Sequence, residues 1–301
     1  MRTARTIVLA LACGTLGAGC LAHHTGPMPG EPRRATFAEV EGVRVRYVDR
    51  GQGPAVVLLH GFASALDTWD TVIPRLARTH RVIALDLKGF GWTDRPPGDY
   101  SPRAQARMVR ALLDARGVRE AAFVAHSWGA SVALAFALRY PSRVTRLALY
   151  DAWVYEEQLP TFFLWARTPG VGEALFSLFY KERPDERLAM AFHDPTRVTE
   201  RFASAVERAL DRPGTVAAAL AAVRGQRYEG MQARYRTIRA PTLLLWGRED
   251  AVTPLAYGER LARDLPDARL VVYPRCGHLP MIEAEGASTR ELEQFLAEPS
   301  P

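Results

Sequence analysis

The stretch from Ala121 to Ala130, which reads A-A-F-V-A-H-S-W-G-A, constrains the fold of this 301-residue chain more than any other. Small and apolar residues at 121–124 predict a strand buried within a sheet. The run S-V-A-L-A-F-A-L-R-Y that follows Ala130 predicts a helix. Only a tight turn can join the two, and Ser127 lies on that turn.

Such a turn raises the hydroxyl of Ser127 above the sheet edge and directs the first N–H groups of the helix toward whatever the serine attacks. The pattern matches the G-x-S-x-G nucleophile elbow, with Ala125 in the first glycine position. A helix cap made of small residues gives the same local pattern. The rest of the chain therefore has to distinguish a nucleophile from a cap.

Strands and helices alternate along most of the chain. Segments 35–40 and 43–48 alternate apolar with polar residues and predict an antiparallel hairpin at a sheet edge. Further buried strands are predicted at 55–59, 81–87, 144–150, 241–246 and 269–273. The order predicts an α/β fold in which a mostly parallel central sheet of about eight strands is flanked by helices.

The alternation lapses between residues 153 and 237, where helices are predicted and no strand. We therefore expect a core of residues 35–152 and 238–297, with residues 153–237 inserted as a helical cap over the strand ends.

The predicted cap is rich in aromatic residues, namely Trp153, Phe162, Phe163, Trp165, Phe176, Phe179, Tyr180 and Phe192. Helical spacing places a group of apolar residues on one face, namely Val171, Leu175, Leu178 and Phe179. This face would either line an apolar pocket beside Ser127 or pack the cap against the core.

The N-terminus predicts export. Two arginines precede an apolar stretch at 7–16, which is shorter than the about 20 residues that a membrane-spanning helix needs. Small residues before Cys20 resemble a bacterial lipobox, in which the cysteine is lipidated, although the usual leucine lies one place too early. We expect residues 1–20 to be an export segment with Cys20 as lipidation site. The protein would be a membrane-anchored lipoprotein, with secretion or an uncleaved anchor as alternatives. Residues 21–34, rich in Pro and Gly, would be a flexible tether.

The composition excludes several classes of protein. With 48% hydrophobic and 24% charged residues, the chain is neither disordered nor fibrous nor a multi-span membrane protein. Its net charge of +6 comes from scattered arginines, so no nucleic-acid partner is expected. Cleavage of the signal at Cys20 removes Cys13 and leaves Cys276 as the only other cysteine, so no intrachain disulfide framework is expected. No metal-binding cluster or dinucleotide motif is recognisable, so no metal and no cofactor is expected. The oligomeric state stays open.

Five segments together resemble the α/β-hydrolase family: H-G-F at 60–62, D-L-K-G-F-G-W-T at 86–93, A-H-S-W-G-A at 125–130, W-G-R-E-D at 246–250 and C-G-H at 276–278. The resemblance covers about residues 35–296 apart from the cap. In this family the nucleophile, the acid and the base follow one another along the chain. Ser127, Asp250 and His278 supply that order.

The chemistry agrees with this assignment. A serine hydroxyl needs a base to remove its proton, and the base needs a carboxylate to fix its tautomer. Each of the three residues follows a predicted strand, at the edge where open α/β sheets place their sites. Asp151 also follows a strand and remains the alternative acid.

The backbone N–H groups of Phe62 and Trp128 would form the oxyanion hole. Three other polar residues near the motifs, His60, His126 and Asp86, are expected to hold the loops in place.

The segment H-S-W-G-A is similar to the H-D-W-G segment of epoxide hydrolases and dehalogenases, with serine in place of aspartate. A serine that attacked saturated carbon would form an ether that does not turn over, so Ser127 favours carbonyl substrates. We expect small to medium apolar carboxylic esters, cleaved through an acyl-enzyme on Ser127. The alternatives are a C–C bond hydrolase, an amidase or peptidase and, in another class, a receptor-like ligand-binding protein with little turnover.

Overall fold

The computed structural model describes residues 21–182 and 184–299. A central sheet of eight strands has the order β1-β2-β4-β3-β5-β6-β7-β8. The strands are β1 (Thr36–Val40), β2 (Val43–Arg50), β3 (Ala55–Leu59), β4 (Arg81–Leu85), β5 (Ala121–His126), β6 (Val144–Tyr150), β7 (Thr242–Gly247) and β8 (Ala268–Tyr273). Strand β2 is antiparallel to β1 and β4, and all other pairs are parallel. The predicted α/β fold is confirmed.

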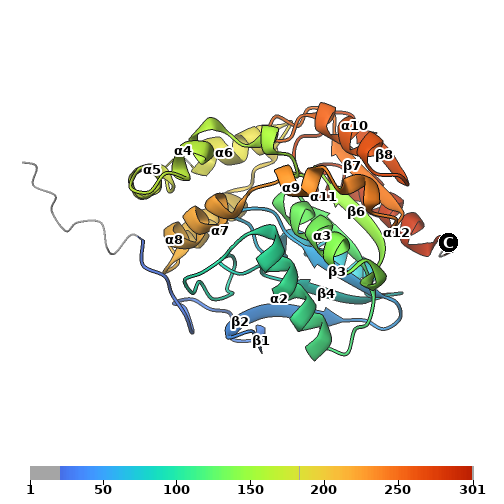
Figure 1. Ribbon diagram of the computed structural model, residues 1–301, viewed down its shortest axis with the longest axis horizontal. Helices are drawn as coiled ribbons and strands as arrows, with labels where there is room; N and C mark the ends of the chain where they lie inside the picture. Colours follow the sequence, from blue (N-terminus) through green and yellow to red (C-terminus); the bar gives the residue numbers. More distant parts are fainter. Residues whose placement is uncertain (1–20, 183, 300–301) are drawn as a thin grey trace, which may run out of the picture.

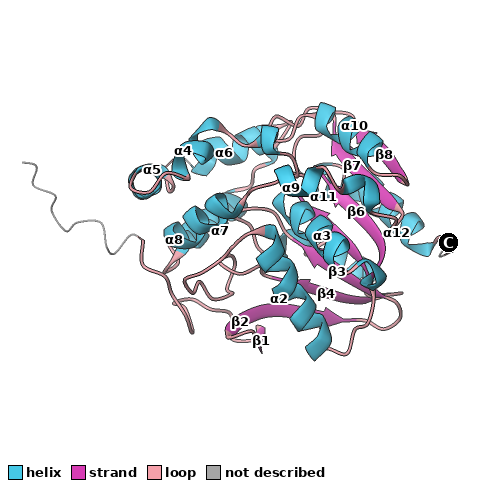
Figure 2. Ribbon diagram, in the orientation of Figure 1, coloured by secondary structure: helices cyan, strands magenta, loops and turns pink. Residues whose placement is uncertain are grey.

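Helices cover both faces of this sheet, because successive residues of a strand point to opposite sides. Val57 and Leu59 of β3 pack on one face with α2 (Pro102–Ala115), α3 (Trp128–Arg139) and α10 (Leu255–Asp264). Val56 and Leu58 pack on the other face with α1 (Val72–Leu76), α11 (Pro280–Glu283) and α12 (Glu285–Ala297). Figure 2 shows α2 and α3 in front of the strands. Burial on both faces explains the continuous apolar runs of the central strands.

The chain between β6 and β7 is helical, and its described residues contain no strand. Its helices are α4 (Thr161–Ala166), α5 (Val171–Phe179), α6 (Pro184–Ala191), α7 (Glu200–Leu210), α8 (Thr215–Gly225) and α9 (Glu229–Gln232). Helices α4 and α5 pack against each other and against α8. Figure 1 shows α4, α5 and α6 as an outer row, with α7 and α8 beneath them.

Residues 21–34 are not the flexible tether that the sequence predicts, because they are fixed to the core. His24 and Arg95 exchange two backbone hydrogen bonds of 3.0 and 2.7 Å. Met28 is buried, and Glu31 accepts two hydrogen bonds of 2.8 and 2.6 Å from the guanidinium of Arg44. Backbone bridges and single side chains make these contacts, and such contacts leave no periodic pattern in the sequence.

The predicted export segment and Cys20 lie outside the described residues. Within the described part of the chain, no helix has both the length and the apolar character needed to cross a membrane.

Candidate active site

Ser127 lies between β5 and α3 in a strained conformation. Its φ of 51° and ψ of −123° are unfavourable for a residue with a side chain. The turn is held by backbone hydrogen bonds: the N–H of Ser127 donates to Tyr150 (2.9 Å), and its carbonyl accepts from Ala130 (3.0 Å) and Trp153 (3.1 Å). The predicted tight turn is therefore present, and it is fixed from both the core and the first residues of the cap segment.

Two glycines allow the close approaches that the turn requires. A Cβ on Gly129 would lie 2.5 Å from the carbonyl oxygen of His60, which is closer than real Cβ atoms come. A Cβ on Gly61 would lie 3.1 Å from the Cβ of Ser127. The H-G-F loop after β3 and the turn that carries Ser127 thus pack directly on each other.

His278 and Asp250 are brought together by the loops after β8 and β7. The Nδ1 of His278 and the Oδ2 of Asp250 are 2.8 Å apart, and both side chains are buried. The Oδ1 of Asp250 accepts from the N–H groups of Val252 (2.7 Å) and Thr253 (2.9 Å).

Burial by itself raises the pKa of Asp250, but the charge of His278 and the hydrogen bonds from His278 and Thr253 outweigh it and lower this pKa below its ordinary value. The ionised carboxylate fixes the tautomer in which Nδ1 of His278 carries the proton, and Nε2 is then the basic nitrogen.

Asp151, the alternative acid, lies directly after β6 with a φ of 43°. Its Oδ1 accepts from the N–H of Gly247 (2.9 Å), while its Oδ2 is buried without a hydrogen bond. Burial and the neighbouring charge of Asp250 raise the pKa of Asp151 well above its ordinary value. In the described residues no hydrogen bond joins Asp151 to His278. The geometry therefore pairs Asp250 with His278, and the raised pKa of Asp151 favours its neutral form.

His126 connects the loop of His278 to the turn of Ser127. Its Nε2 donates to the carbonyl oxygen of His278 (2.8 Å), and the two rings are 4.7 Å apart between centroids. Burial, assisted by the charge of His278, lowers the pKa of His126 to about 3, so this ring stays neutral. No hydrogen bond joins the hydroxyl of Ser127 to His278 among the described residues. Such contacts are often long before substrate binds.

His60 and Asp86 hold loops in place, as the sequence indicates. The Nδ1 of His60 donates to the carbonyl oxygen of Gly61 (2.7 Å), and its Nε2 accepts from the N–H of Leu87 (2.9 Å). The Oδ2 of Asp86 accepts from the N–H of Trp92 (2.7 Å) and so closes the turn after β4.

The predicted oxyanion donors both have free N–H groups. Trp128 is the first residue of α3, where N–H groups have no acceptor within the helix. Phe62 follows Gly61, whose backbone packs against Ser127. Within the described part of the chain, neither amide donates a hydrogen bond to another group.

Aromatic side chains from the core and the cap surround Phe62 of the H-G-F loop after β3. The centroid of the Phe62 ring lies 5.4 Å from that of Phe90 and 6.3 Å from that of Trp128, both of the core. It also lies 5.7 Å from Phe163 of α4 and 6.5 Å from Tyr180, which follows α5. Phe163 and Tyr180 therefore place cap rings beside Phe62 of the predicted oxyanion loop.

The eight aromatic residues that the sequence analysis names in the cap divide into two groups. Five are buried, namely Trp153, Phe163, Phe176, Tyr180 and Phe192. Three are exposed, namely Phe162, Trp165 and Phe179. The first group packs within the chain, and of the second group Phe162 lies with its ring centroid 4.6 Å from that of Phe163.

Of the α5 face that was expected to point inward, Leu175 packs against the core and the other members point outward. Val171 and Leu178 on that face are 43% and 64% exposed, whereas Gly172 and Phe176 are buried. A Cβ on Gly172 would lie 2.2 Å from the carbonyl oxygen of Ala166. The glycine thus lets α5 approach the end of α4, and this contact selects the inward face.

Thr253 is a site residue that the sequence reasoning missed. Its hydroxyl donates to the Oδ2 of Asp250 and lies 3.4 Å from the Nδ1 of His278. It follows the aspartate by three residues in the run D-A-V-T. A hydroxyl residue at this spacing can contact the preceding carboxylate within one turn. The D-x-x-T spacing is therefore the sequence pattern that indicates Thr253.

Asp151, Asp250 and His278 also have possible ligand atoms within 4.8 Å of one another. The hydrogen bond between His278 and Asp250 already occupies two of these side chains. A metal ion would have to replace that bond, so the arrangement fits an oriented histidine base better than a metal centre.

The sequence profile of the α/β hydrolase fold family matches residues 54–285. This chain belongs to that family. It is 33% identical over 270 residues to 2-hydroxy-6-oxo-2,4-heptadienoate hydrolase of Pseudomonas putida, a match that covers 85% of this chain and 94% of that enzyme. It is also 34% identical to 2-hydroxymuconate semialdehyde hydrolase of Pseudomonas putida, covering 85% of this chain and 92% of the relative.

Solved structures of two hydrolases are similar as well. A meta-cleavage product hydrolase from Pseudomonas fluorescens IP01 matches with a TM-score of 0.73 at 30% identity, covering 87% of this chain and 97% of that one. A thermophilic esterase from Thermogutta terrifontis matches with a TM-score of 0.75 at 26% identity, covering 87% and 98%. Together with the family match, these similarities identify the protein as a hydrolase.

Proposed function

We propose that the protein is a serine hydrolase that cleaves carbonyl compounds through an acyl-enzyme on Ser127. His278 takes the proton of the hydroxyl on Nε2, and Asp250 stabilises the resulting imidazolium. The free N–H groups of Phe62 and Trp128 hold the oxyanion. The protonated His278 then donates its proton to the leaving group. Water, deprotonated by His278, attacks the acyl-enzyme and releases the acid and free Ser127. The observation that carries the proposal is the 2.8 Å pair of His278 and Asp250, which His126 ties to the strained turn of Ser127.

Small to medium apolar carboxylic esters are the substrates that the site favours. The four rings that surround Phe62 are aromatic and present no carboxylate or ammonium group. Such a lining suits an apolar acyl or aryl group. An ester also expels an alkoxide, which is an easier leaving group than a carbanion or an amide nitrogen.

Hydrolysis of a C–C bond next to a ketone is the second candidate. The names of the curated relatives favour it, because 2-hydroxy-6-oxo-2,4-heptadienoate hydrolase is named for a ketone that also carries a carboxylate. The same serine and oxyanion donors would serve this reaction, since attack again occurs at a carbonyl carbon. The difference lies in the leaving group, which departs as a stabilised carbanion and takes a proton on carbon.

A substrate panel separates these reactions. We expect kcat/KM for p-nitrophenyl esters of two to eight carbons to exceed that for 2-hydroxy-6-oxo-2,4-heptadienoate by about tenfold or more. Replacement Ser127→Ala should lower kcat by roughly 10³-fold or more for either substrate. A higher kcat/KM for the ketone would assign C–C hydrolysis instead. A chain that turns over neither substrate and resists an organophosphate probe would be a receptor-like protein.

We also propose that residues 1–20 direct export and that Cys20 carries a lipid, on the basis of the basic start, the short apolar stretch and the small residues before the cysteine. Expression of the full chain in a bacterial host with a radioactive fatty acid should label the wild type, and Cys20→Ser should abolish the label. Equal labelling of the two proteins would contradict a lipid on Cys20.

A further inference from the structure

The strongly exposed large hydrophobic side chains of the described residues all belong to the cap. Met190 on α6 is one of them, at 61% exposure. The others lie on α4 and α5 with exposures of 41–64%, and we call them the apolar cap surface: Phe162, Leu164, Trp165, Val171, Leu178 and Phe179. Single exposed apolar residues are ordinary, but a group on two adjacent helices indicates a binding surface.

Packing within the chain leaves about half of this surface exposed. Helices α4 and α5 already contact the rest of the protein through other side chains, including Phe163 and Phe176, which are buried. Both helices therefore carry apolar residues on the inner and the outer side. Apolar residues on the outer side of a helix as well as on its inner side indicate a surface that meets another apolar partner.

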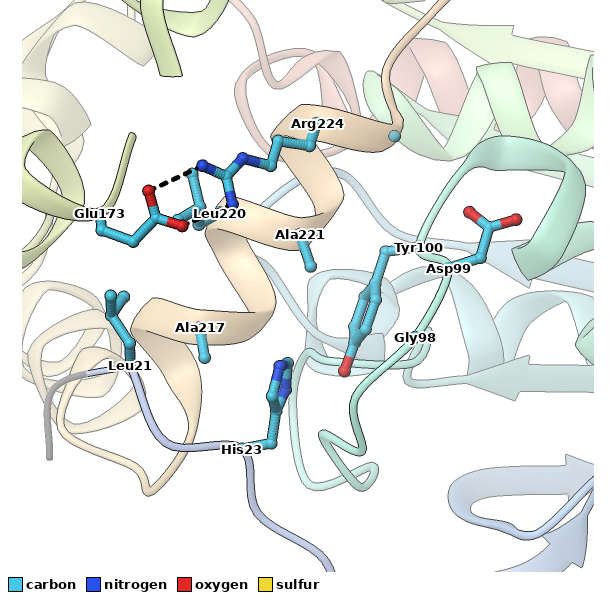
Figure 3. Close-up of a pocket in the computed structure, with 11 residues that line it drawn as sticks. Leu21, His23, Gly98, Asp99, Tyr100, Glu173, Ala217, Leu220, Ala221 and Arg224 are labelled. Carbon is cyan, nitrogen blue, oxygen red and sulfur yellow. Dashed lines mark hydrogen bonds and ion pairs between the residues drawn. The ribbon is translucent and has the colours of Figure 1, made fainter. Parts of the chain in front are cut away.

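The described chain begins beside α5 and α8. Leu21 packs against the core and lines a cavity of about 410 Å³ together with Glu173 of α5 and Ala217 of α8. Figure 3 shows Leu21 next to these two residues. The 20 residues that precede Leu21, with their apolar stretch at 7–16 and Cys20, are thus connected to the protein beside α5, the helix that carries Val171, Leu178 and Phe179 of the apolar cap surface.

We propose that the apolar cap surface docks the protein onto a lipid surface, in the orientation that the N-terminal segment also requires. Tryptophan and phenylalanine side chains such as Trp165 and Phe162 suit the boundary between head groups and acyl chains. A lipid on Cys20 would enter the same layer, because its neighbour Leu21 lies beside α5. The proposal does not depend on which bond the enzyme cleaves.

Apolar contact rather than charge drives this docking. Around the surface, Glu173 forms an ion pair of 2.8 Å with Arg224, and Lys181 forms one of 2.9 Å with Asp211. The opposite charges within each pair cancel, so these residues supply no basic patch for anionic lipids. We therefore expect the full chain to bind neutral phosphatidylcholine vesicles, with little effect of salt.

The test uses the full chain, with and without Cys20→Ser, and vesicles whose phosphatidylcholine tails carry bromine. Bromine quenches tryptophan fluorescence at short range. The difference between the wild type and Trp165→Phe isolates the signal of Trp165 among the six tryptophans. We expect quenching of Trp165 in both backgrounds. In the Cys20→Ser background, Trp165→Ser with Leu178→Ser should weaken vesicle binding about tenfold or more.

A conservative pair, Trp165→Phe with Leu178→Met, should bind vesicles like the wild type, and thermal unfolding should be equal for all variants. Vesicle binding without quenching of Trp165 would overturn the proposal, because the N-terminus alone would then hold the lipid. A dimer in lipid-free buffer that the serine variants dissociate would also overturn it, because a second copy would then cover the surface.

Discussion

The ends of β6 and β7 carry the same residue type with opposite properties. Asp151 and Asp250 are both buried, and both follow strands that pair in parallel. Yet the pKa of Asp250 is lowered and that of Asp151 is raised. Asp250 accepts hydrogen bonds on both oxygens, from the loop that follows it and from His278, whereas Asp151 accepts one, from Gly247. The donors around a carboxyl group, rather than its place at the sheet edge, distinguish the two aspartates.

Loop geometry creates this difference. Asp151 directly follows Tyr150, the last residue of β6, and its φ of 43° turns it toward the next strand. Asp250 comes three residues after the end of β7 at Gly247, on a loop that closes on Asp250 through the N–H of Thr253. The longer connection gives Asp250 both its donors and its reach to His278.

The largest effect on turnover is expected for Asp250→Asn. The amide cannot stabilise a charged imidazole, and it also favours the wrong tautomer of His278. We expect kcat to fall about 10⁴-fold with an unchanged fold, measured with the best ester of the panel. The double variant Asp250→Asn with Asp151→Asn should be no slower than the single one. A single variant that keeps near-normal turnover, and loses it in the double variant, would show that Asp151 is the acid.

An intermediate effect is expected for Thr253→Val, which removes the hydroxyl bonded to Asp250 but keeps the shape of the side chain. Hydrogen bonds to charged groups contribute about 1.5–3 kcal/mol, so kcat should fall by roughly tenfold to a hundredfold. Thr253→Ser is the matched control, because it restores the hydroxyl and should restore most of kcat. Equal rates for the valine and serine variants would show that the hydroxyl does not support Asp250.

The sequence predicts those parts of the molecule that follow from periodicity and from strand ends. Alternation of apolar runs and helices was sufficient for the eight-stranded sheet, and the residues that follow its strands include Ser127, Asp250 and His278. Thr253 was missed because its role depends on the fold of a loop rather than on a pattern.

Two further differences between the predictions from sequence and the structure have the same physical origin. The apolar residues of α5 offer two possible inward faces, and only the contact at Gly172 selects one. Residues 21–34 are held by a backbone bridge between His24 and Arg95 and by isolated side chains. Neither contact leaves a period in the sequence, because each depends on a partner far along the chain or on backbone atoms that all residues share.

The smallest effect on turnover is expected for Asp151→Asn, because an amide closely imitates a protonated carboxyl group. We expect kcat at neutral pH to stay within about threefold of the wild type, whereas the pH dependence of stability should change. The folded protein keeps the proton of Asp151 above the pH at which an unfolded aspartate loses it, about pH 4. The folded state therefore binds more protons, and its stability falls as pH rises from there toward the raised pKa.

The Asp151→Asn variant has no carboxyl group at this position to titrate. Between about pH 4 and the raised pKa of Asp151, its free energy of unfolding relative to the wild type should therefore rise by up to about 1.4 kcal/mol per pH unit. Urea unfolding of both proteins at several values between pH 4 and pH 8 measures the difference. Parallel stability profiles would mean that Asp151 is ionised in the folded state. The contrast with Asp250 would then rest on hydrogen bonding alone, and the buried charge of Asp151 would need a partner that the strand end does not provide.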